Sequence, residues 1–149
     1  MRTGPKWLHL ARAELGTKEA PGPANNPDVV QYYVDAVGKK HQDEIAWCAA
    51  FVGAMLRRAG RQGTNSLLAR SYLKWGAPCQ PIIGAICILR RGEPWQGHVG
   101  FVDAVHDDTV TIIGGNQGNA VTRARFSKAK VLGYRWPPLS STEKLGVKT

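Results

Sequence analysis

The chain has 149 residues, which is the size of one domain and enough to bury a hydrophobic core without metals or disulfides. Hydrophobic residues make up 43% of it, so the composition excludes collagen, a coiled coil and an intrinsically disordered protein. The 20 Lys and Arg residues outnumber the 11 Asp and Glu residues and give a net charge of +9. Such a charge indicates a polyanionic environment: nucleic acid, a membrane surface or an acidic cell-wall polymer.

The three cysteines, Cys48, Cys79 and Cys87, follow no regular spacing. An odd number without a CxxC pair predicts neither a disulfide framework nor a zinc site, so we expect reduced thiols, no metal and no other cofactor. No apolar run approaches the roughly 20 residues that cross a bilayer, and the N-terminus resembles a helix more than a signal peptide. We therefore expect a protein made in the cytoplasm without a signal peptide or a transmembrane segment.

Hydrophobic periodicity in the first half of the chain predicts four helices. They cover residues 5–16, 27–37, 47–60 and 66–75. Asn26 can cap the second helix, Pro27 suits its first turn and Gly38 can end it. The third helix has the clearest pattern, because its apolar residues fall on one face and two arginines lie in its last turn.

After Pro81 the pattern changes to short apolar runs separated by turns, which is typical of strands. The expected strands cover residues 82–89, 98–105, 109–115, 120–126 and 131–136. Helices followed by strands favour an α+β fold. No linker or repeat divides the chain, so we expect a single domain over residues 1–138 and a flexible C-terminal tail over residues 139–149.

Three polar residues occupy positions from which they could act together. Cys48 begins the third helix, where free backbone N–H groups and the helix dipole are expected to lower its thiol pKa. His98 begins a strand and Asn116 follows the next one, so a hairpin through residues 106–108 would bring them together. A thiol nucleophile, an imidazole base and an amide that orients the imidazole suit thiol acyl transfer. Each residue alone also fits an ordinary role: a core thiol, a structural histidine and a turn residue.

Three segments of the sequence resemble the small cell-wall peptidases of the CHAP class (cysteine- and histidine-dependent amidohydrolase/peptidase), relatives of the NlpC-type and papain-like hydrolases. They are DEIAWCAAFV (43–52), GHVGFVDAV (97–105) and IIGGNQGN (112–119), in that order. The resemblance extends from about Trp7 to Pro137. It implies a papain-like α+β fold, with N-terminal helices and a nucleophile helix packed on a small C-terminal antiparallel sheet.

The resemblance also implies a role for each of the three residues. Cys48 would be the nucleophile, His98 the base and then the acid, and Asn116 the residue that orients the imidazole. The substrate would be peptidoglycan, cleaved at an amide bond by a stem-peptide endopeptidase or an N-acetylmuramoyl-L-alanine amidase, as in a phage endolysin or an antibacterial effector. We expect a monomer that reaches the cell wall after release or injection through a holin, a phage or a secretion system.

Four residues near the catalytic segments are weaker candidates for the substrate site or the oxyanion site: Gln42, Asp43, Trp47 and Trp95. Gln42 stands six residues before Cys48, which is the spacing of a side-chain oxyanion donor in papain-type enzymes. Asp43 matches the resembling branch better, and could position the loop or bind an amino group of the substrate. The two tryptophans could line the groove or pack in the core.

Two other functions remain open from the sequence. A non-catalytic cell-wall-binding or phage structural module could use the same fold, and would bind wall fragments without releasing amines. A nucleic-acid-binding protein would fit the charge, but no helix carries a concentrated basic stripe and no zinc-finger spacing occurs, so we do not expect nucleic acid as a partner.

Overall fold

The computed structural model describes residues 4–18, 26–38, 47–92 and 96–138. Within these ranges the helices come first in the chain and the strands follow, which confirms the α+β class. The elements are α1 (Lys6–Ala13), α2 (Pro27–Val37), α3 (Cys48–Arg58), the 3₁₀ helix η1 (Ala69–Lys74), β1 (Ala77–Pro78), β2 (Ile86–Arg90), β3 (Gly97–Val105), β4 (Thr109–Gly114), β5 (Thr122–Ser127), the 3₁₀ helix η2 (Lys128–Lys130) and β6 (Val131–Trp136).

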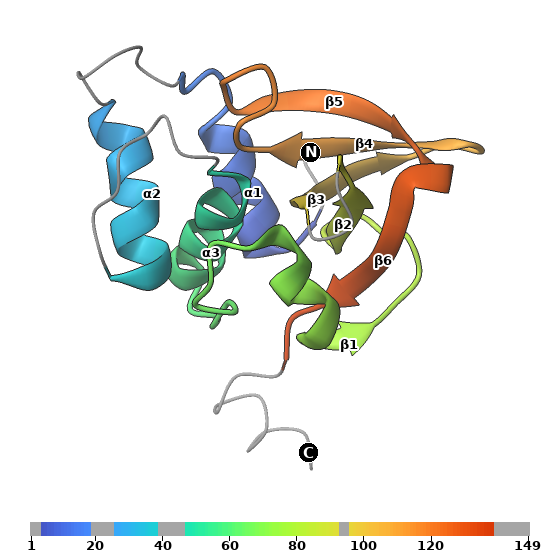
Figure 1. The fold of residues 1–149 in the computed structure, drawn as a ribbon, viewed down its shortest axis with the longest axis horizontal. Coiled ribbons are helices and arrows are strands. Elements are labelled where there is room, and N and C mark those ends of the chain that lie inside the picture. Colours follow the sequence, from blue (N-terminus) through green and yellow to red (C-terminus); the bar gives the residue numbers. More distant parts are fainter. Residues whose placement is uncertain (1–3, 19–25, 39–46, 93–95, 139–149) are drawn as a thin grey trace.

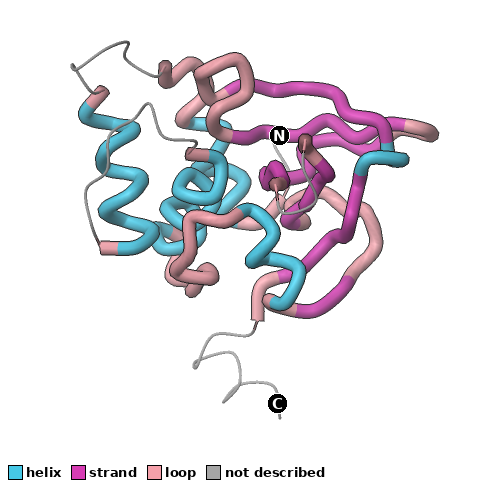
Figure 2. Tube along the Cα trace, in the orientation of Figure 1, coloured by secondary structure: helices cyan, strands magenta, loops and turns pink. Residues whose placement is uncertain are grey.

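The strands form one antiparallel sheet in the order β1-β6-β2-β3-β4-β5. Figure 1 shows α1, α2 and α3 gathered beside this sheet, and Figure 2 shows the same separation of helices from strands along the trace. β3 and β4 pair as a hairpin, with Phe101 opposite Ile113 and Val105 opposite Val110. The predicted hairpin through residues 106–108 is therefore confirmed, and the start of β3 lies beside the end of β4.

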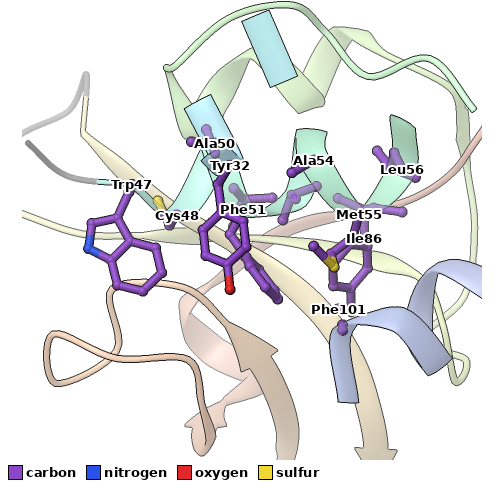
Figure 3. Close-up of a cluster of buried hydrophobic side chains, with 14 of the residues drawn as sticks. Tyr32, Trp47, Cys48, Ala50, Phe51, Ala54, Met55, Leu56, Ile86 and Phe101 are labelled. Carbon is purple, nitrogen blue, oxygen red and sulfur yellow. The ribbon is translucent and has the colours of Figure 1, made fainter. Parts of the chain in front are cut away.

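Helix α3 is buried along most of its length between the sheet and the other helices. Every residue from Cys48 to Leu56 is buried, whereas a surface helix would keep a polar face. Phe51 packs edge-on against Tyr32 of α2 at a centroid distance of 5.2 Å and against Phe101 of β3 at 6.2 Å. Figure 3 shows this aromatic cluster with Cys48 at one end of the helix. Contacts on both sides thus fix the position of the Cys48 backbone.

Polar contacts join the helices to each other and to the sheet. Arg58 of α3 binds Asp35 of α2 at 2.7 Å, which links these two helices. Asp103 of β3 accepts hydrogen bonds from Arg12 of α1 and Arg123 of β5, both at 2.8 Å. No helix in the described part of the chain is both long and apolar enough to cross a membrane.

The structure differs from the sequence prediction in three short segments. The short helix predicted at 66–75 covers only Ala69–Lys74 and is a 3₁₀ helix. The strand predicted at 82–89 begins only at Ile86, because Gly84 turns the chain with a φ of 93° and its carbonyl accepts a hydrogen bond from the Trp7 indole at 2.7 Å. The two-residue strand β1, which pairs with β6, was not predicted.

Candidate active site

Cys48 is the first residue of α3, as the sequence predicts, and its side chain is 5% exposed. Its sulfur accepts hydrogen bonds from backbone N–H groups of two elements: that of Val99 in β3 and those of Ala49 and Cys48 itself in α3. Val99 directly follows His98 in the chain. The beginning of the nucleophile helix therefore meets the beginning of the strand that carries the histidine.

His98 is the second residue of β3 and is also 5% exposed. Its ring nitrogen Nε2 lies 2.8 Å from Oε1 of Gln117. The imidazole also lies against the Phe126 ring of β5, with the centroids 5.6 Å apart. A polar contact on one ring nitrogen and an aromatic neighbour together hold the ring in one orientation.

The contacts of Gln117 assign the tautomer of His98. The Gln117 amide nitrogen donates to the carbonyl oxygens of Thr122 at 2.8 Å and of Ile112 at 3.3 Å. Since both partners are acceptors, the amide nitrogen must face them and Oε1 must face the imidazole. A carbonyl oxygen accepts, so Nε2 of His98 carries the hydrogen. The other ring nitrogen, Nδ1, is then the one able to take a proton.

The structure gives to Gln117 the hydrogen bond that we expected from Asn116. Strand β4 ends at Gly114, and Asn116 lies in the following turn with a left-handed φ of 59°. Asn116 lines the same cavity as His98, whereas the buried Gln117 reaches the ring. The sequence has two adjacent amide side chains after β4, those of Asn116 and Gln117. Only the backbone path of the turn determines which of them reaches His98.

Two glycines allow the turn after β4 to approach both neighbours closely. A Cβ on Gly114 would lie 2.6 Å from Gln117 Oε1 and 3.1 Å from His98 Nε2. A Cβ on Gly115 would lie 2.7 Å from the Trp47 ring, beside the beginning of α3. The missing side chain of Gly114 therefore leaves room for the hydrogen bond between His98 and Gln117. The missing side chain of Gly115 leaves room for Trp47 at the start of α3.

Burial shifts the pKa values of the two central groups toward their neutral forms. Burial raises the pKa of the Cys48 thiol, although the hydrogen bond from Val99 and the charge of Arg91 oppose the shift. Burial lowers the pKa of His98, against the raising effect of its hydrogen bond to Gln117. The expected fall in the Cys48 pKa is therefore wrong, because desolvation outweighs the helix N-terminus. Both shifts favour the uncharged thiol and the uncharged imidazole.

A cavity of about 810 Å³ opens beside His98. Its lining comes from β2, β3, β5, η2 and the turns between strands. The described residues that form it are Leu89, Arg90, Arg91, Gly92, His98, Asn116, Gln117, Gly118, Thr122, Ala124, Phe126 and Lys130. Cys48 is not among them.

Of the four weaker candidates for the substrate or oxyanion site, the structure describes only Trp47. Trp47 is fully buried and stacks on Tyr32 at a centroid distance of 5.8 Å, so it packs in the core. Gln42, Asp43 and Trp95 lie outside the described residues. Within the described ranges no three His, Cys, Asp or Glu side chains gather as a metal site would require.

Comparison with known families gives one match. The family model of the CHAP domain matches residues 40–116, slightly more than half of the chain. This chain belongs to the CHAP family. The matched CHAP segment contains Cys48 and His98 and ends at Asn116, one residue before Gln117. CHAP membership indicates a hydrolase related to peptidoglycan, and the six-stranded antiparallel sheet with its packed helices agrees with the papain-like CHAP fold. A search of curated proteins found no match.

Proposed function

We propose that this CHAP domain is a peptidoglycan hydrolase that cleaves an amide bond by thiol acyl transfer. The observation that carries the proposal is the hydrogen bond from His98 to Gln117 beside a cysteine at a helix N-terminus. It supports an imidazole held in one tautomer, whose other ring nitrogen can act as a base. In this proposal Cys48 is the nucleophile, His98 is the base, and Gln117 takes the positioning role that the family resemblance implied for Asn116.

The reaction begins from the neutral pair. His98 Nδ1 takes the thiol proton as the Cys48 sulfur attacks the carbonyl carbon of the substrate amide. The carbonyl π electrons move to oxygen and form an oxyanion, for which the backbone N–H groups at the beginning of α3 are suitable donors. The C–N bond then breaks, the amine leaves with the proton from His98, and a thioester remains on Cys48.

Hydrolysis of the thioester completes the cycle. His98 Nδ1 takes a proton from water, the resulting hydroxyl attacks the thioester carbon, and the C–S bond breaks. The sulfur recovers its proton from His98 as the new carboxylic acid leaves. Through both halves Gln117 Oε1 accepts from Nε2–H and favours the imidazolium that forms each time.

The net charge of +9 supports a polyanionic target. Peptidoglycan peptides carry carboxylates and many cell walls carry phosphate polymers. A basic protein concentrates at such a surface weakly, in a manner that salt suppresses. This attraction brings the domain to the wall, while the site selects the bond.

The proposal predicts that the purified protein releases new amino groups and soluble fragments from isolated peptidoglycan. Mass spectrometry of the fragments names the bond: separation of sugar from L-alanine indicates an amidase, and shortened peptides indicate an endopeptidase. Protein that binds the wall without releasing amines would instead support the non-catalytic binding module.

A further inference from the structure

The cavity beside His98 has an apolar floor and a basic rim. Leu89 of β2 and Phe126 of β5 contribute apolar lining. Arg90, Arg91 and Lys130 also line the cavity, and all three side chains are exposed. Arg90 ends β2, Arg91 directly follows it, and Lys130 ends η2, so segments distant in sequence place positive charge at one cavity.

This positive charge is not neutralised within the described part of the chain. No acidic residue there lines the cavity. The ion pairs found among the described residues use Arg12, Arg58 and Arg123, and none involves the three cations of the rim. An anionic ligand would therefore meet cations without displacing a carboxylate of the described chain.

Arg91 is electrostatically coupled to both central groups of the site. Burial raises the pKa of Cys48 and Arg91 is among the influences that lower it. Burial also lowers the pKa of His98, Gln117 raises it, and Arg91 lowers it further. Arg91 also lines the same cavity as His98, so an anion bound to its guanidinium would lie in the cavity that contains the imidazole.

We infer that this cavity is a specificity subsite for a free carboxylate of the peptidoglycan stem peptide, with Arg91 as its principal cation. The inference rests on the proposed function and names what the site selects. A guanidinium binds a carboxylate with two parallel hydrogen bonds, whereas a carboxamide offers one acceptor and no charge. The volume of about 810 Å³ is in the range of ligand pockets and accommodates a short peptide. The apolar floor suits the aliphatic part of that peptide.

The test compares two synthetic muramoyl tripeptides, N-acetylmuramoyl-L-Ala-γ-D-Glu-L-Lys with all carboxylates free and the same compound with all of them converted to carboxamides. The wild-type protein should hydrolyse the free acid with a kcat/KM about tenfold higher. Arg91→Gln should reduce this preference to about twofold or less. Arg57→Gln removes an exposed arginine from the last turn of α3 and should keep the preference, which controls for overall charge.

Binding to the Cys48→Ala variant, measured by calorimetry, separates the subsite from the proposed reaction. The subsite predicts that Cys48→Ala binds the free acid more tightly than the carboxamide, and that the double variant Cys48→Ala/Arg91→Gln does not. This result would support the subsite even if the wild type hydrolyses neither compound. Hydrolysis of both compounds at equal rates by the wild type would overturn the subsite and leave the hydrolase. A preference that survives Arg91→Gln, or is lost equally with Arg57→Gln, would also overturn it.

Discussion

Replacing Cys48 with alanine is expected to reduce amine release from peptidoglycan by about 10⁴-fold or more, because the variant cannot form the thioester. The loss should appear in kcat. The side chain is small and its backbone is held by α3, so the thermal unfolding midpoint should change little. Amine release from isolated cell walls, together with thermal unfolding followed by circular dichroism, measures both quantities.

Cys79→Ala is the matched control for the nucleophile. Cys79 is a free cysteine that is only partly buried and lies outside the cavity beside His98. Its replacement should leave amine release within about twofold of the wild type, since surface changes away from special features have small effects. If a folded Cys48→Ala protein still cleaves cell walls at the wild-type rate, the thiol mechanism is contradicted.

Gln117→Leu is expected to lower kcat by about 10²-fold, because Nε2 of His98 loses the acceptor that fixes its tautomer. KM should change less, since the proposed role of Gln117 is to position the imidazole. Asn116→Gly is the matched control, because glycine adopts the left-handed backbone of this turn without strain. It should keep kcat within about threefold. The opposite ranking would return the orienting role to Asn116.

The pH dependence separates a positioning role of Gln117 from a merely structural one. The neutral imidazole is the active form, so activity falls as the pH drops through the pKa of His98, which burial holds below its ordinary value of about 6.5. Gln117→Leu removes an influence that raises this pKa, so the acidic limb of the kcat/KM profile should move to lower pH. Gln117→Glu places a carboxylate there and should move the limb to higher pH. An acidic limb that stays in place in both variants would contradict the role.

The sequence predicted the fold closely where local chemistry decides it. Asn26 caps α2 by accepting a hydrogen bond from the Asp28 amide, and Gly38 ends that helix in the left-handed conformation. Both are visible in the sequence. The segment at 66–75 was less predictable, because its apolar spacing fits a short helix of either type. The late start of β2 depends on a contact between Gly84 and Trp7, 77 positions apart, which no local pattern contains.

The candidate site was predictable in its residue types and less so in its energetics. A cysteine before an apolar helix and a histidine opening a strand identified Cys48 and His98. The choice of Gln117 over Asn116 depends on the path of one turn. The direction of the Cys48 pKa shift depends on how deeply the folded protein buries the thiol, which a helix N-terminus in the sequence does not disclose. The basic rim of the cavity could not be predicted from the sequence, because Lys130 and Arg91 are far apart in the chain.

The coupling of Cys48 to His98 is tested most directly by the rate at which iodoacetamide alkylates Cys48 near pH 7, measured by peptide mass spectrometry in the wild type and in His98→Gln. Cys79 serves as the internal control in each sample. If His98 assists the thiol, the substitution should slow alkylation of Cys48 by at least about tenfold and leave the rate at Cys79 unchanged. Equal rates at Cys48 in the two proteins would contradict a shared thiol–imidazole centre.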